Sequence, residues 1–183
     1  MSNNTKLTQP LKDKAKRIKL IVMDVDGVLT QGHIVMDASG REIKFFDVQD
    51  GFGLFLWRKA GFKSAIITAG DTVAVKKRAD YLKIDVVYQN VHNKLASYKK
   101  LKDKFRINDS EICFIGDDLM DLPLLKKAGL SCCVSNARAD IMPCAHYVSR
   151  REGGRGAVRE IIELILKSKG LWGKVTGDYF TTG

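Results

Sequence analysis

The sequence predicts an α/β fold built on a doubly wound parallel sheet, with helices on both faces. From residue 63 to residue 168, short apolar runs that suit buried parallel strands alternate with longer segments of helical periodicity. Such alternation is typical of parallel strands joined by right-handed crossovers. The 183 residues, 45% of them hydrophobic, suffice for one domain with a substantial core. No apolar run approaches the roughly 18–20 residues of a membrane span, so no membrane partner is expected.

The chain begins with a basic N-terminal extension, residues 1–17, in which residues 10–17 suit a short helix. A buried strand is expected at 18–23. Residues 33–48 alternate in polarity around a glycine-containing turn and predict a β-hairpin. Apolar groups lie on both faces of this two-stranded ribbon, so it is expected to pair with other copies of the chain. A helix should then run from Asp50, its expected N-cap, to about Ala60, with Gly61 ending it.

The main domain, residues 18–168, is completed by alternating elements. We expect strands at 63–68, 85–88, 112–115, 130–134 and 146–148, and helices at 72–82, 93–104, 119–127, 138–142 and 156–168. Pro143 should end the helix at 138–142. Residues 169–183 are expected to form a flexible C-terminal tail, whose aromatic side chains are either disordered or docked on the domain.

The formal net charge of +10 is concentrated in residues 1–19, which hold about half of the excess. Basic residues elsewhere are spread over helix faces and are not interleaved with aromatic ones, so a nucleic-acid partner is not expected. A general attraction for anionic sugar phosphates fits the charge equally well. The four cysteines form no CxxC or Cys/His metal pattern, which favours reduced thiols in a cytoplasmic protein.

Two carboxylates follow the first strand directly. Asp24 and Asp26 lie on either side of its C-terminal end, and Gly27 allows the chain to turn. Open α/β sheets place their ligand sites at this edge. Because two such close acids repel each other, the pair calls for a hard cation such as Mg²⁺. The alternative is an ordinary strand-to-turn junction with solvated acids.

Three later segments deliver polar groups to the same edge of the sheet. Thr68 ends one strand, Lys94 opens a helix after another, and a third strand ends in Gly116-Asp117-Asp118-Leu119-Met120-Asp121. A lone threonine or lysine carries little information, since most lysines are solvated. The combination, in this order along the chain, is what indicates a site.

These four motifs resemble those of the haloacid dehalogenase superfamily of phosphotransferases, over about residues 18–166. The resemblance implies a Rossmann-like core and gives Asp24 the role of nucleophile that forms an aspartyl-phosphate. Asp26 would protonate the leaving alcohol and later activate water. Thr68 and Lys94 would hold the transferring phosphoryl group.

The same resemblance implies that Mg²⁺ is bound by Asp24, by the backbone carbonyl of Asp26 and by Asp117. Asp118 and Asp121 would orient the waters on the metal and Lys94. Asp121 has an alternative role as the cap of the helix expected at 119–127.

Neither residues 31–49 nor residues 69–93 are numerous enough to hold an inserted cap domain. The chain resembles the capless 3-deoxy-D-manno-octulosonate 8-phosphate phosphatase family in four stretches, residues 24–30, 50–53, 116–123 and 153–160. That family implies a homotetramer built through the hairpins, in which a neighbouring subunit closes each site. It also implies hydrolysis of 3-deoxy-D-manno-octulosonate (KDO) 8-phosphate, a small-molecule sugar phosphate, in lipopolysaccharide precursor synthesis.

By the same resemblance, the substrate-binding residues would come from the first and third motifs, the segment around the start of the helix at 50–60, the following helix and the glycine-rich segment at 153–156. They are Asp26, Asp47, Val48, Gln49, Asp50, Gly51, Arg78, Lys94 and Arg155. For the glycine-rich segment the alternative is a helix-start loop with a solvated Arg155.

The chain departs from the family where the substrate anion is expected to bind. Typical members carry Thr-Gly-Arg in the second motif, but Gly70 stands at the arginine position here, and Gln49 and Phe55 also replace frequent arginines. Two alternatives therefore stay open. One is a phosphatase for a nine-carbon 2-keto-3-deoxynonulosonate 9-phosphate, and the other is a catalytically silent scaffold that kept the fold.

Overall fold

The computed structural model describes residues 8–180. Its strands are β1 (Leu20–Met23), β2 (Val35–Met36), β3 (Glu42–Ile43), β4 (Lys63–Ile67), β5 (Val86–Tyr88), β6 (Ile112–Gly116), β7 (Leu130–Cys133) and β8 (Tyr147–Val148). Its α-helices are α1 (Gln9–Arg17), α2 (Val48–Lys59), α3 (Val73–Leu82), α4 (Lys94–Phe105), α5 (Leu122–Leu125), α6 (Ala157–Ser168) and α7 (Trp172–Thr176). Short 3₁₀ helices lie at Asp109–Glu111, Leu119–Asp121, Met142–Cys144 and Gly177–Tyr179.

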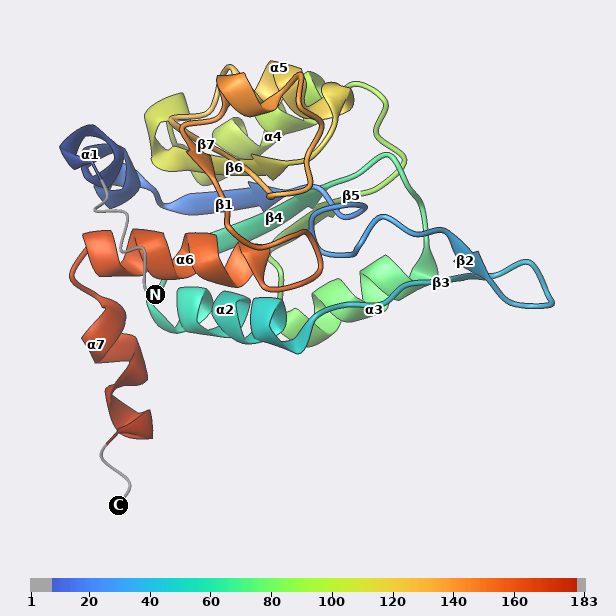
Figure 1. The fold of residues 1–183 in the computed structure, drawn as a ribbon, viewed down its shortest axis with the longest axis horizontal. Helices are drawn as coiled ribbons and strands as arrows, with labels where there is room; N and C mark the ends of the chain where they lie inside the picture. Colours follow the sequence, from blue (N-terminus) through green and yellow to red (C-terminus); the bar gives the residue numbers. More distant parts are fainter. Residues whose placement is uncertain (1–7, 181–183) are drawn as a thin grey trace.

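Six strands form one sheet in the order β5-β4-β1-β6-β7-β8, and every neighbouring pair is parallel. The central strand β1 is buried at all four positions, as expected for a strand covered on both faces. Helices α2, α3 and α6 cover one face of the sheet, and α4 and α5 cover the other (Figure 1). The predicted doubly wound α/β architecture is confirmed.

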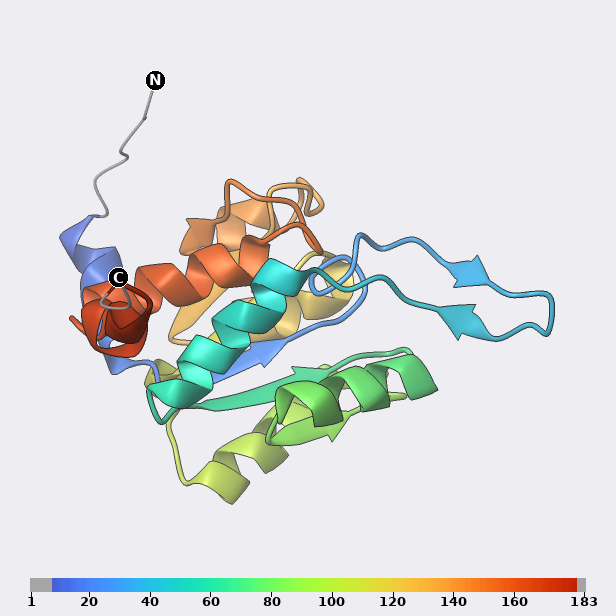
Figure 2. The ribbon, with the colours of Figure 1, turned by 90° about the horizontal axis from the view of Figure 1, so that it is seen from below.

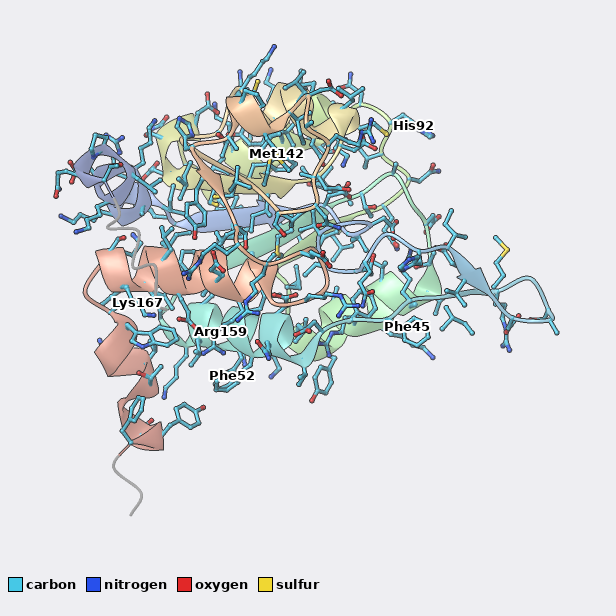
Figure 3. All side chains as sticks on the ribbon, in the orientation of Figure 1. Phe45, Phe52, His92, Met142, Arg159 and Lys167 are labelled. Carbon is cyan, nitrogen blue, oxygen red and sulfur yellow. The ribbon has the colours of Figure 1, made fainter. Side chains whose placement is uncertain are left out.

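Strands β2 and β3 form the predicted hairpin, which extends beyond the sheet on the side where β1 ends (Figures 1 and 2). The Asp37 side chain organises its turn by accepting hydrogen bonds from the backbone N–H of Ser39 and of Arg41. Ile34, Met36 and Phe45 are 76%, 64% and 66% exposed, and Figure 3 shows Phe45 directed away from the sheet. Such apolar exposure on a projecting ribbon indicates a contact surface.

Two short helices differ from the prediction. The segment expected as one helix at 119–127 is a 3₁₀ turn at Leu119–Asp121 followed by the four-residue helix α5. The helix expected at 138–142 is absent, and a 3₁₀ helix forms at Met142–Cys144 instead. Pro143 lies in the first turn of that helix, where its missing N–H costs nothing, and does not end a preceding one.

The described part of the C-terminal tail is helical and docked on the domain. The Trp172 ring makes cation–π contacts with Arg159 and Lys167 of α6, whose charged groups lie 5.3 and 4.9 Å from its centroid. The Tyr179 ring meets Phe52 of α2 edge-on, with centroids 5.5 Å apart, and Figure 3 shows Phe52 and Arg159 on the adjacent helices α2 and α6. Through residue 180 the tail therefore follows the docked alternative, and residues 181–183 lie outside the described residues.

Candidate active site

The polar residues of the motifs meet at the carboxyl edge of the sheet. Asp24 follows β1, Thr68 follows β4 and Asp117 follows β6, and these three strands are neighbours. Lys94 is the first residue of α4, which follows β5. The strands are parallel, so their ends coincide, and groups from four distant parts of the sequence come together.

Lys94 forms the centre of an ion-paired cluster. Its ammonium donates to Asp24 Oδ2 at 2.7 Å and to Asp121 Oδ1 at 2.6 Å. Asp24, Asp117 and Asp121 each offer a carboxylate oxygen, and these atoms all lie within 4.8 Å of one another. The Lys94 and Asp121 side chains are almost fully buried, so water screens their interaction little.

The cluster carries more negative than positive charge, and its pKa values reflect this. Burial raises the pKa of Asp24 to about 6, and Asp121 adds to the rise, although Lys94 opposes it. Burial also raises the pKa of Asp117 to about 7, with further contributions from Asp121 and Asp24. Burial alone would lower the pKa of Lys94, but the two carboxylates it contacts outweigh burial and raise it. The excess negative charge favours an additional cation.

The donor set fits Mg²⁺. Carboxylate oxygens are the hard ligands that this ion prefers, and Asp24 and Asp117 supply them at one place. Asp121 belongs to the same cluster, but its oxygens accept hydrogen bonds from Lys94 Nζ and from the backbone N–H of Asp117. Asp121 therefore fixes the lysine and the loop that carries Asp117. The same side chain accepts from the backbone N–H of Asp118 and so closes a capping box on the 3₁₀ turn at Leu119–Asp121, which agrees with the capping alternative for the start of this segment.

Gly27 allows the loop after β1 to approach this cluster. Its φ is +82°, a conformation that glycine adopts without strain. A Cβ atom at this position would lie 1.9 Å from Asp117 Oδ2. The glycine thus provides both the turn after Asp26 and the space for the Asp117 carboxylate.

Asp26 and Thr68 both lie close to Gly70. A Cβ atom on Gly70 would lie 3.3 Å from Asp26 Oδ2 and 3.8 Å from Thr68 Oγ1. Thr68 is buried, and its hydroxyl accepts a hydrogen bond from the Gly70 N–H at 3.3 Å. The Asp26 side chain is 41% exposed. A carboxyl group and a hydroxyl group therefore lie near each other beside Gly70 at the sheet edge.

One residue at the site has no signal in the sequence. Lys44, at the base of the hairpin, donates to Asp26 Oδ1 at 2.5 Å and to Glu42 Oε1 at 2.6 Å. Burial alone would lower the pKa of Lys44, but these two carboxylates raise it, so the ammonium stays charged. The position of Lys44 depends on how the hairpin docks against the loop after β1. No local sequence pattern predicts this docking.

Asp118, expected beside Asp121, is exposed and has a local partner. Its Oδ1 accepts from the backbone N–H of Leu119 at 2.6 Å, so the side chain caps the 3₁₀ turn. An orienting role toward metal waters stays a prediction for this residue.

The segment expected to bind substrate, residues 47–51, forms the start of α2. Asp47 is the N-cap, accepting from the N–H of Gln49 at 2.6 Å, and Val48 and Gln49 are exposed. The expected cap, Asp50, is instead buried, and its carboxylate accepts from the N–H of Arg159 at 2.8 Å and from that of Gly156. Burial raises the pKa of Asp50 to about 6. Asp50 therefore joins α2 to the start of α6.

The two arginines expected to bind substrate make contacts within the chain. Arg78 lies against Gly51, stacks on the Phe46 and Tyr81 rings, and donates to the Asp47 carbonyl at 3.2 Å. Arg155 is exposed and donates to Gln31 Oε1 at 3.2 Å. Neither contact joins the ion-paired cluster, so their substrate roles stay predictions.

Comparisons with known proteins agree with this geometry. A family model of haloacid dehalogenase-like hydrolases matches residues 62–162. The chain is 40% identical over 165 residues to KdsC of Escherichia coli K12, a 3-deoxy-D-manno-octulosonate 8-phosphate phosphatase, covering 90% of this chain and 88% of that protein.

Solved structures show the same fold. A phosphatase of this name from Moraxella catarrhalis, solved with magnesium, phosphate and KDO, is 38% identical, with a TM-score of 0.92 over 94% of this chain and 99% of that one. A probable YrbI family phosphatase from Pseudomonas syringae is 37% identical, with a TM-score of 0.94 over 96% and 100% of the two chains. The chain belongs to the haloacid dehalogenase-like hydrolases, within the 3-deoxy-D-manno-octulosonate 8-phosphate phosphatase family.

Proposed function

We propose that the protein is a Mg²⁺-dependent phosphatase that releases phosphate from KDO 8-phosphate. The observation that carries the proposal is the buried contact of Lys94 with Asp24, beside Asp117, at the edge of the sheet. The 40% identity to KdsC and the KDO bound in the Moraxella catarrhalis relative support this substrate for the chain. The reaction would serve lipopolysaccharide precursor synthesis.

Asp24 is the proposed nucleophile. Its carboxylate attacks phosphorus, the bond from phosphorus to the sugar oxygen breaks, and an aspartyl-phosphate forms. Lys94 holds Asp24 in place and stabilises the negative charge of the transferring phosphoryl group. The Thr68 hydroxyl, buried at the end of β4, is available to hydrogen-bond a phosphoryl oxygen.

Asp26 is the proposed general acid and base. It delivers a proton to the departing sugar oxygen, then takes one from the water that hydrolyses the aspartyl-phosphate. The second step releases phosphate and restores the Asp24 carboxylate. Asp26 Oδ2 faces the same space as the Thr68 hydroxyl, which is consistent with this role.

Mg²⁺ would be held by the carboxylates of Asp24 and Asp117 and by the backbone carbonyl of Asp26. When bound, the ion offsets the repulsion between the carboxylates and the phosphoryl oxygens. The raised pKa values of Asp24 and Asp117 support a site that gains from a divalent cation. Asp118 and Asp121 remain proposed supports for the waters on the ion and for Lys94.

Substrate contacts are proposed from residues 47–51, Arg78 and Arg155, with Arg155 reaching the site of a neighbouring subunit. Gly70 leaves a space beside Asp26 where an arginine would otherwise meet the anionic end of the sugar. The missing arginine keeps one second candidate open, the nine-carbon 2-keto-3-deoxynonulosonate 9-phosphate.

A homotetramer in the cytoplasm is proposed as the working form. The exposed Ile34, Met36 and Phe45 of the hairpin region support assembly through that ribbon. Four free cysteines support a reducing compartment. Within the described residues, no helix has the length and apolar character needed to cross a bilayer.

Phosphate release tests the proposal. The purified protein should hydrolyse KDO 8-phosphate faster than the nine-carbon ester, and EDTA should abolish the activity until Mg²⁺ is returned. Asp24→Asn should remove activity, whereas Asp80→Asn, on the exposed surface of α3, should not change it. A wild type without turnover on acid-sugar phosphates would contradict the proposal and favour the silent scaffold. Preference for the nine-carbon ester would correct the substrate alone.

A further inference from the structure

The Lys44 side chain is unusually placed for a hairpin residue. It is 2% exposed, although the strands beside it carry several exposed apolar groups. Its ammonium lies between two carboxylates, Asp26 Oδ1 at 2.5 Å and Glu42 Oε1 at 2.6 Å. Glu42 is a neighbour within the hairpin, but Asp26 belongs to the loop after β1. The lysine therefore connects the hairpin to the proposed active site.

The contact holds only one of the two Asp26 oxygens. Lys44 binds Oδ1, and the Thr30 hydroxyl lies 3.4 Å from the same atom. Oδ2 points toward Gly70, on the side of the Thr68 hydroxyl. Asp26 is 41% exposed, so without Lys44 only the longer hydrogen bond from Thr30 would restrain its carboxyl group. With Lys44 in place, one oxygen is fixed and the other faces the phosphoryl side.

We propose that Lys44 is a positioning residue, which orients Asp26 so that Oδ2 can deliver its proton to the departing alcohol oxygen. The inference rests on the proposed phosphatase function and adds to it a residue of the hairpin. It has a structural consequence, because a shift of the hairpin would move the ammonium and release the Asp26 carboxyl group. Correct docking of the hairpin and proton transfer at Asp26 are thereby coupled.

General acid catalysis provides a specific test. An alkyl phosphate has a poor leaving group and needs the proton, whereas p-nitrophenyl phosphate has a good one and needs it much less. The value of kcat/KM reports the steps up to departure of the alcohol. Lys44→Met should therefore lower kcat/KM by about 10- to 100-fold for the best alkyl sugar phosphate of the wild type. For p-nitrophenyl phosphate the loss should be under about threefold.

Three further variants distinguish an effect of Lys44 on the orientation of Asp26 from an effect on the folding of the protein. Lys44→Arg keeps a donor and should return most of the lost kcat/KM for the sugar phosphate. Glu42→Gln removes the partner within the hairpin only and should leave the ratio of the two substrates unchanged. Lys99→Met, an exposed lysine of α4, controls for loss of charge. Size-exclusion chromatography and urea unfolding should be run on each variant.

The outcomes of these experiments distinguish a positioning role of Lys44 from a structural role and from no role. Equal losses on both substrates in Lys44→Met would overturn the positioning role and leave a purely structural one. Wild-type kinetics in Lys44→Met would overturn any role. A wild type that hydrolyses neither ester would instead contradict the proposed phosphatase function. The positioning role proposed for Lys44 would then be wrong as well. An alkyl-specific loss, restored by arginine, is the result the proposal requires.

Discussion

Lys94 and Asp24 are 70 residues apart in the sequence, yet the lysine ammonium lies 2.7 Å from the aspartate carboxylate. Both side chains lie largely out of water, where an unpaired charge is costly. The same ammonium also contacts the buried Asp121, so one positive charge compensates two negative ones. Folding thus concentrates charge at the sheet edge, and we expect this concentration to affect both the stability and the chemistry of the site.

Lys94→Met should impair both properties. It leaves the Asp24 and Asp121 carboxylates uncompensated, and breaking a buried pair in this way costs about 3–5 kcal/mol of unfolding free energy. If Lys94 stabilises the phosphoryl group as proposed, removing its charge should lower kcat about 100- to 1000-fold. Urea unfolding and phosphate release measure the two effects, with Lys99→Met of the same helix as control. Wild-type stability at pH 8 in Lys94→Met would contradict the arrangement.

Magnesium should stabilise the protein in a pH-dependent way. Asp24 and Asp117 have folded pKa values raised to about 6 and about 7. A raised pKa means that the folded state binds the proton more tightly than the unfolded state does. The stability from these two groups is therefore full below their ordinary pKa of 3.8 and is lost as the pH rises through about 6 and 7. In the protein without metal, the contribution of Asp24 and Asp117 to the free energy of unfolding should therefore decrease between pH 4 and pH 8.

The ion reverses that loss, because it replaces the bound protons. At 100 times its dissociation constant Mg²⁺ adds about 2.7 kcal/mol, or about 5–10 °C in Tm for a domain of this size. The shift should be larger at pH 8 than at pH 5.5 in thermal unfolding monitored by circular dichroism. Asp117→Asn should reduce it at both pH values. Equal shifts at the two pH values would show that the ion binds elsewhere.

The sequence allowed the positions of Asp24, Thr68 and Asp117 to be predicted because each follows a short strand whose residues are mostly apolar. Parallel strands end at one edge, so this local pattern carries three-dimensional information. Asp50 shows the limit of local rules. Its place before an apolar segment predicts an N-cap, but Asp47 takes that role, and Asp50 caps the start of α6, 106 residues later.

Lys44 shows the same limit at the site itself. Nothing in the hairpin sequence indicates that one lysine folds back onto Asp26 while its neighbours stay exposed. The contact depends on the angle between the hairpin and the sheet, which packing of distant segments determines. The similarity to known phosphatases predicts the reaction and the class of substrate. It does not predict the contact between Lys44 and Asp26.

Gly153→Ala should test how tightly the glycine-rich segment packs on the loop after β1. A Cβ atom at position 153 would lie 1.6 Å from the Gly27 carbonyl oxygen, so backbone must move. Overpacking of this kind costs about 1–3 kcal/mol of unfolding free energy. Because Gly27 follows Asp26, kcat should fall as well.

Gly173→Ala is the matched control. A Cβ atom at position 173 would meet nothing within 4 Å, and helix propensity favours alanine over glycine by up to about 1 kcal/mol. Equal stability of the two variants would contradict the close packing.

Gly70→Arg should strengthen binding of acid-sugar phosphates. The position faces the space between Asp26 and Thr68, and its backbone needs no left-handed conformation, so a side chain is sterically acceptable after a small adjustment of the Asp26 carboxylate. A charged hydrogen bond to the substrate carboxylate contributes about 1.5–3 kcal/mol, which corresponds to a decrease in KM of about 10- to 100-fold. The decrease should appear for KDO 8-phosphate and be absent for p-nitrophenyl phosphate, which has no carboxylate. Gly70→Ala separates the effect of the guanidinium group from that of filling the space. If KM falls equally for both esters, the arginine binds the phosphoryl group they share, and the sugar carboxylate must be recognised elsewhere on the protein.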